Sequence, residues 1–315
     1  MIEQPTVLSV VGPTASGKTA LSVALAKQFD GEIVSADAVA VYRGLDIGSA
    51  KPTAEERQGI PHHMIDFAEL SDEQFTVSVF REQARNAIEG ILVKNRLPIV
   101  VGGSGLYADA IFSDMRFSVP SDPSLRAELE TDYDQDKDAL FALLSASDPI
   151  TASRLHPNDK KRVVRAMEVY RLTGQPFSAL NRDFVDAQAG DGTYRVVRIG
   201  LNTDRETLYS RINLRVDRMI EIGLIDEAYR LFANGYTPER FTAMQAIGYA
   251  QLYEAYCGRC SVADAIEEIK RSTRHFAKRQ ITWFKRDPNT VWFDVQKHSE
   301  EDIIKSVTEL LYGNQ

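Results

Sequence analysis

Short apolar runs recur along the chain and predict buried β-strands. They cover residues 7–11, 32–35, 63–67, 97–101, 194–201 and 291–295. Helical spacing of apolar positions lies between several of them, as over residues 75–94. Short apolar strands that alternate with helices are typical of a parallel sheet with helices on both faces. We therefore expect a doubly wound α/β core, in which ligands bind beyond the carboxyl ends of the strands.

The pattern changes between residues 120 and 192, where strand-like runs disappear. Asp122, Asp148 and Asp159 stand where helix N-caps are expected, and the last of them precedes a helical segment over residues 160–172. Residues 186–192 are small and polar and predict a loop. We expect three parts: a first part of the core over 1–119, a helical insertion over 120–192, and a second part of the core over 193–315.

Two long helices are predicted after the strand at residues 194–201. The first runs to Asn234-Gly235, and the second begins after Ser261, a favourable N-cap residue. Apolar residues at helical spacing give each helix a buried stripe. The members of the two stripes are Leu208, Ile212, Val216 and Met219 in the first helix, and Ile269, Phe276 and Trp283 in the second.

The turn after the first strand matches the phosphate-loop pattern G-x-x-x-x-G-K-[ST] in full. It lies between the strand at 7–11 and a predicted helix at 20–26, the context that the motif requires. Its backbone N–H groups, the lysine charge and the helix N-terminus suit a diphosphate or longer, and Thr19 suits Mg²⁺. The diphosphate-binding residues of this loop are Gly12, Pro13, Thr14, Ala15, Ser16, Gly17, Lys18 and Thr19.

Composition limits the class of protein. The chain has 315 residues, of which 43% are hydrophobic and 26% charged, as in ordinary globular proteins. No apolar run approaches the length of a membrane helix, and no signal peptide is apparent, so we expect a cytoplasmic protein without a membrane partner. Cys257 and Cys260 lack further ligands nearby and are interpreted as free thiols.

The net charge of −8 argues against a nucleic-acid partner, but its distribution does not. Residues 269–286 carry seven basic residues and no acid, and a solvated helix face is the alternative to a polyanion-binding stripe. These basic residues are Lys270, Arg271, Arg274, Lys278, Arg279, Lys285 and Arg286.

Taken alone, the phosphate loop suggests ATP and leaves the reaction open. The Mg²⁺-binding Asp of an NTPase usually ends an apolar strand, whereas the run at 97–101 ends in glycines. Asp37 follows the strand at 32–35 and suits a ligand of Mg²⁺, an acceptor of a proton, or a turn cap. His62-His63 is interpreted as structural, and Tyr107 and Trp283 suit either base stacking or core packing.

The chain resembles the tRNA dimethylallyltransferases, also called tRNA isopentenyltransferases, of the bacterial type. The resemblance runs nearly end to end and includes Val-Tyr-Arg-Gly-Leu-Asp-Ile-Gly-Ser-Ala-Lys-Pro at 41–52 and Lys-Arg-Val-Val-Arg at 161–165. Its remaining motifs lie at residues 12–19, 35–37, 61–66, 101–107, 155–159, 166–170, 173–177, 223–224, 246–249 and 279–284, together with Arg215.

The resemblance implies transfer of a dimethylallyl group from its diphosphate to N6 of the adenosine 3′ of the anticodon. It implies that Lys18, Arg215 and Mg²⁺ stabilise the leaving diphosphate, and that Asp37 accepts the amine proton. It also implies that a tRNA anticodon stem-loop is bound by a larger set of residues. That set is Asp37, Ala38, Val39, Ala40, Ser104, Lys161, Arg162, Val163, Val164, Arg165, Arg274 and Lys278.

The sequence departs from the family pattern after Asp37, where Asp-Ser-x-Gln-Val-Tyr is common. Ala38 and Ala40 replace two side chains able to hydrogen-bond a base, and Ser104 replaces a common Thr. Three other functions stay open: a small-molecule kinase, prenyl transfer to free AMP or ADP, and RNA binding without catalysis. We expect a monomer.

Overall fold

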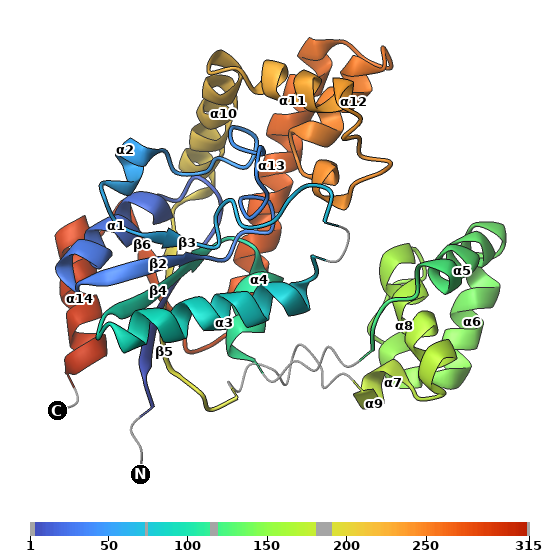
Figure 1. Cartoon of the computed structure of the whole chain (residues 1–315), viewed down its shortest axis with the longest axis horizontal. Coiled ribbons are helices and arrows are strands. Elements are labelled where there is room, and N and C mark those ends of the chain that lie inside the picture. The colour runs from blue at the N-terminus through green and yellow to red at the C-terminus, as the bar shows by residue number, and fades with distance from the viewer. Residues whose placement is uncertain (1–3, 73–74, 114–118, 181–190, 314–315) are drawn as a thin grey trace. The chain divides into compact units, whose positions relative to one another are not determined.

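The computed structural model describes residues 4–72, 75–113, 119–180 and 191–313. The chain divides into two compact units. The core unit consists of Met1–Phe112 and Gly192–Gln315, and the helical unit consists of Ser113–Asp191. The core unit contains all six strands of one parallel sheet, and the helical unit contains α5 to α9 (Figure 1).

The sheet has the strand order β3-β2-β4-β1-β5-β6, and every described pair of neighbours is parallel. The prediction of a strand over 63–67 was wrong beyond His63, because Met64 and Asp66 adopt left-handed φ values of 62° and 53° that interrupt extended backbone. The strands are β1 (Thr6–Val11), β2 (Gly31–Ser35), β3 (His62–His63), β4 (Leu97–Gly102), β5 (Arg195–Asn202) and β6 (Val291–Asp294).

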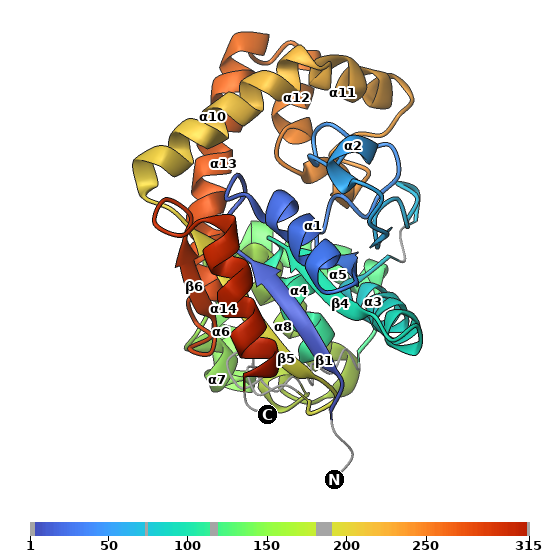
Figure 2. The same ribbon diagram turned by 90° about the vertical axis from the view of Figure 1, so that its left-hand side faces the viewer.

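Helices cover both faces of the sheet, as the doubly wound prediction required. Val7 and Val11 of β1 pack on one side with α3 (Val77–Val93) and α4 (Gly105–Phe112). Leu8 and Val10 pack on the other side with α1 (Lys18–Gln28) and α14 (Glu300–Tyr312), which lie to the right and left of β1 in Figure 2. Alternate residues of a buried strand therefore serve two separate cores.

Beyond the sheet, four helices form the end of the core unit that lies above it in Figure 1. The single long helix predicted up to residue 234 is two helices, since Gly223 has a φ of 103° that a helix cannot contain. In the helix from Val262 to Phe284, Phe276 and Trp283 are half-buried, and the buried residues are Ala265, Ile269, Ala277, Gln280 and Phe284. The helices are α10 (Arg205–Glu221), α11 (Leu224–Ala233), α12 (Tyr249–Tyr256) and α13 (Val262–Phe284).

In the helical unit, the three predicted N-caps are confirmed. The carboxylates of Asp122, Asp148 and Asp159 accept hydrogen bonds from the first turns of α5, α7 and α8. Of the predicted loop at 186–192, residues 186–190 lie outside the described part of the chain. The helices of this unit are α5 (Pro123–Gln135), α6 (Lys137–Ser147), α7 (Pro149–Ala152), α8 (Lys160–Thr173) and α9 (Phe177–Leu180).

Candidate active site

The phosphate loop follows β1 at the carboxyl end of the sheet, between the neighbouring strands β4 and β5. Gly17, with a φ of 92°, is the N-cap of α1 and offers no side chain to its first turn. The N–H groups of that turn are therefore left for an anion. The hydroxyl of Ser16, itself a residue of this loop, is buried without a hydrogen-bond partner among the described residues.

Two basic side chains converge on this loop from different elements. Lys18 donates from Nζ to the Pro13 carbonyl at 2.7 Å, and Arg215 of α10 donates to the Thr14 hydroxyl at 3.3 Å. Burial and the charge of Arg215 lower the pKa of Lys18 to about 7, although the charge of Asp37 opposes them. Burial likewise lowers the pKa of Arg215. A bound anion would relieve this repulsion between like charges.

Gln280 holds the phosphate loop to the loop after β4. Its side-chain carbonyl accepts from the Thr14 N–H at 2.8 Å, and its amide donates to the Gly103 carbonyl at 2.9 Å. A Cβ at Gly103 would lie 2.2 Å from that amide nitrogen, so a larger residue there would displace the Gln280 side chain. Gln280 is not among the site residues predicted from the sequence; a polar residue on the buried face of a helix was the available signal.

Asp37 lies directly beyond β2, at the same end of the sheet as the phosphate loop. One carboxylate oxygen, Oδ1, accepts from the N–H groups of Val39 and Ala40 at 2.8 and 3.0 Å. The carboxylate therefore caps a turn, which is one of the three roles that the sequence allowed for Asp37. Its charge also favours protonation of Lys18 and Arg215, so the three groups share one electrostatic environment.

The residues after Asp37 are largely fixed by the fold. The Ser104 hydroxyl accepts from the Ala38 N–H at 3.0 Å, so Ser104 positions this turn. Val39 packs against the helices of the core unit, and Ala40 is buried. Of the three residues 38–40, only Ala38 is half-exposed without belonging to a buried cluster.

The basic stripe of α13 is less uniform than its sequence indicates. Lys270 pairs with Asp217 of α10 and with Glu267, and is only 15% exposed. Arg274 donates to Asn213 at 2.7 Å and stacks on the Tyr209 ring. Lys278 is exposed, and the ion pairs found among the described residues do not include it.

The predicted RNA-binding residues of α8 differ in their exposure to solvent. Lys161 and Arg162 are exposed, whereas Val163 and Val164 are buried in the core of the helical unit. The contact of these two valines with RNA stays a prediction, and their side chains lie on the face of α8 that packs in that core. Arg165 donates to the buried Glu168 at 2.7 Å and to the Val119 carbonyl.

The weaker candidates have structural roles. His63 donates to or accepts from the buried Glu32 at 2.7 Å, at the amino end of the sheet. Trp283 donates to Asp109 at 2.7 Å, and Tyr107 packs on Phe80. Cys257 and Cys260 are free thiols.

Within residues 4–72, 75–113, 119–180 and 191–313, His, Cys, Asp and Glu side chains form no group of three that suits a metal ion. In the same ranges, none of the helices combines the length and apolar character of a membrane span. The exposed Thr19 hydroxyl, in the first turn of α1, still fits a Mg²⁺ ion carried mainly by phosphate oxygens.

Comparison with known proteins places the chain in a family. Residues 40–287 match the family model "IPP transferase". The tRNA dimethylallyltransferase of Geobacillus kaustophilus is 46% identical over 91% of this chain and 89% of its own length. That of Pelotomaculum thermopropionicum is 42% identical over 94% of this chain and 93% of its own.

Solved structures agree with these relatives. The full-length tRNA isopentenylpyrophosphate transferase of Bacillus halodurans has a TM-score of 0.72 at 40% identity, over 99% of this chain and 96% of its own. A eukaryotic dimethylallyltransferase, solved acting on tRNA, has a TM-score of 0.82 at 28% identity, over 99% of this chain and 80% of its own. The chain belongs to the IPP transferase family.

Proposed function

We propose that this protein is a tRNA dimethylallyltransferase that uses dimethylallyl diphosphate to prenylate N6 of the adenosine 3′ of the anticodon. The observation that carries the proposal is the arrangement of Asp37, Lys18 and Arg215. Two basic groups that suit a leaving diphosphate share their electrostatic environment with a carboxylate that suits an amine proton. The tRNA dimethylallyltransferases among its relatives support the same reaction.

The phosphate loop would bind the part of the donor that is discarded. As the bond between C1 and the diphosphate oxygen breaks, its electron pair remains on the diphosphate. Lys18, Arg215 and the N–H groups at the start of α1 stabilise that charge. The Thr19 hydroxyl would hold Mg²⁺, which neutralises part of the diphosphate charge when bound.

Asp37 would act on the acceptor. The N6 amine is a weak nucleophile, because its lone pair is delocalised into the ring, and it loses a proton as its bond to C1 forms. With Oδ1 of Asp37 engaged by two backbone N–H groups, Oδ2 is the oxygen that would accept this proton. The adenine must leave its stack to reach this carboxylate.

Exposed basic residues on both units suit the phosphates of an anticodon stem-loop. On the core unit these are Lys278 and the half-exposed Arg274, and on the helical unit they are Lys161 and Arg162. Ala38 would contact the RNA through its backbone. Ser104 would contact it through a hydroxyl that already accepts a hydrogen bond from the Ala38 N–H. The cytoplasmic location and the monomeric state of the protein stay predictions.

The deciding experiment incubates the protein with labelled dimethylallyl diphosphate, Mg²⁺ and unmodified tRNA, and then analyses the nucleosides. Label on N6 of the adenosine 3′ of the anticodon is the expected result. Parallel reactions with AMP and ADP test transfer to free nucleotides, and ATP affinity tests the kinase alternative. Tight ATP binding with no binding of dimethylallyl diphosphate would overturn the proposal, as would tRNA binding with no transfer.

A further inference from the structure

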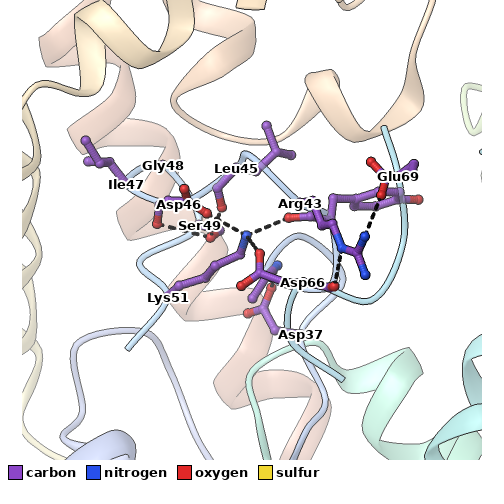
Figure 3. A network of polar contacts seen from close by, with 12 residues as sticks. Asp37, Arg43, Leu45, Asp46, Ile47, Gly48, Ser49, Lys51, Asp66 and Glu69 are labelled. Atoms are coloured by element: carbon purple, nitrogen blue, oxygen red, sulfur yellow. Dashed lines mark hydrogen bonds and ion pairs between the residues drawn. The ribbon is translucent and has the colours of Figure 1, made fainter. Parts of the chain in front are cut away.

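Lys51 lies outside the groups assigned to the reaction, yet it is the most enclosed cation of the loop that follows Asp37. Its side chain is 5% exposed and reaches between three acceptors (Figure 3). These are the Tyr42 carbonyl at 2.6 Å, Asp46 at 2.8 Å and Asp66 at 2.6 Å. A lysine ammonium has three donors, and each has a partner here.

We propose that Lys51 is a positioning residue that fixes the loop carrying Asp37. This rests on the proposed function, because it assigns Lys51 a role through the proton-accepting carboxylate. Lys51 itself contacts neither the phosphate loop nor Asp37 in the hydrogen bonds and ion pairs of the described residues.

The connection to Asp37 is short and runs through Ala40. The Asp66 N–H donates to the Ala40 carbonyl at 3.3 Å, and the Ala40 N–H donates to Asp37 Oδ1 at 3.0 Å. The next residue, Val41, accepts at its carbonyl from Phe67 and Ala68. Asp66 has a left-handed φ of 53°, a conformation whose cost its contacts must offset. The ion pair with Lys51 is one such contact.

The opposite end of the same loop is anchored to the helices. The buried Glu227 of α11 accepts from the N–H groups of Asp46, Ile47 and Gly48 at 3.1, 2.9 and 3.1 Å. It also accepts from the Tyr249 hydroxyl at 2.6 Å. A Cβ at Gly48 would lie 2.5 Å from the Tyr249 ring, so glycine is required for this approach.

Lys51 therefore joins two fixed points. Through Asp46 it reaches the segment anchored on α11, which directly follows α10 and its Arg215. Through Asp66 and Tyr42 it reaches the segment that holds Asp37. The placement of Asp37 relative to Arg215 depends on this lysine, and misplacement of a reacting group by about 1 Å costs on the order of 100-fold in rate.

The test compares kcat, tRNA KM, donor affinity and Tm for Lys51→Met, Asp66→Asn and a control, Lys27→Met, in the full chain. Lys27 is an exposed α1 lysine that contacts Gln58. We expect Lys51→Met to lower kcat by about 10- to 100-fold with donor affinity changed less than about twofold. Asp66→Asn should lower kcat by a smaller factor, since asparagine tolerates the left-handed backbone at this position. Lys27→Met should match wild type.

A double-mutant cycle separates positioning from general loss of structure. In an Asp37→Asn background, Lys51→Met should lower the residual rate by less than about twofold, because its effect passes through the carboxylate already removed. Multiplicative losses would overturn the proposal, and so would unchanged kcat in folded Lys51→Met. If that variant does not fold, Asp66→Asn decides through the same cycle. Inactive wild-type protein would instead refute the proposed function.

Discussion

The two ends of the parallel sheet differ in how their buried charges are compensated. At the amino end, Glu32 is 1% exposed and is hydrogen-bonded to His63, Lys94 and Arg96. Burial disfavours its ionised form, but those three bonds outweigh burial and lower its pKa to about 2. At the carboxyl end, burial and the like charge of Arg215 lower the pKa of Lys18 to about 7.

The charges at the amino end stabilise the fold, whereas those at the carboxyl end suit the binding of a ligand. A compensated buried charge stabilises its surroundings, and a buried charge beside another of the same sign is stabilised by an added counterion. Five substitutions, in four experiments, test this distinction.

The largest effect is expected at the carboxyl end. Asp37→Ala should lower kcat by roughly 10²- to 10⁴-fold, the contribution of a general base, while leaving diphosphate binding intact. Single-turnover kinetics with saturating donor measure the rate, and equilibrium binding measures donor affinity. Near-normal turnover would remove Asp37 from the reaction.

At the amino end, Glu32→Gln should lower the free energy of unfolding by roughly 3 kcal/mol, because Lys94 and Arg96 lose their shared anion and His63 loses a carboxylate partner. In the wild type this contribution is present above the carboxyl's ordinary pKa near 4.5 and is lost as pH falls toward 2. Urea unfolding at neutral and acidic pH measures both. A variant as stable as wild type at pH 7 would contradict the structural role, whereas unchanged donor affinity is expected.

Gln280→Leu should weaken dimethylallyl diphosphate binding by about tenfold. It leaves the Thr14 N–H of the phosphate loop and the Gly103 carbonyl without their partner, and each unmade buried bond costs about 1–3 kcal/mol. Glu32→Gln is the matched control, since it destabilises the fold at the other end of the sheet. Equal donor affinity in the two variants would contradict the assignment.

The smallest effect distinguishes two lysines of one helix. Lys278→Ala should weaken tRNA binding and reduce the slope of log affinity against log salt by about 0.7–0.9, one phosphate contact. Lys270→Ala removes a lysine already paired with Asp217 and Glu267, so its slope should equal wild type. Filter binding over a salt series measures both slopes, and equal losses would refute the distinction.

Sequence patterns predicted what neighbours along the chain determine. The phosphate loop, the strands around it and the N-caps at Asp122, Asp148 and Asp159 depend on a few adjacent residues. Resemblance to a family added Arg215, which lies at Thr14 although no local pattern leads there.

The rest depends on contacts between distant segments. Lys51 looked like an ordinary loop lysine until the fold enclosed it between Asp46 and Asp66. Val163 and Val164 were included with their basic neighbours, yet the helical period directs them into a core. The prediction of a basic stripe on α13 did not include the ion pair between Lys270 and Asp217 of α10, because Asp217 lies on another helix.

The Gln280 bridge has a consequence for synthesis of the chain. Thr14 and Gln280 are 266 residues apart, and β1 also needs β5 beside it. A ribosome that has made the phosphate loop must translate most of the remaining chain before the loop obtains its final partner. At about 5–20 residues per second, this takes on the order of 13 to 53 seconds. A truncated chain that ends before α13 therefore carries the motif without its finished binding site.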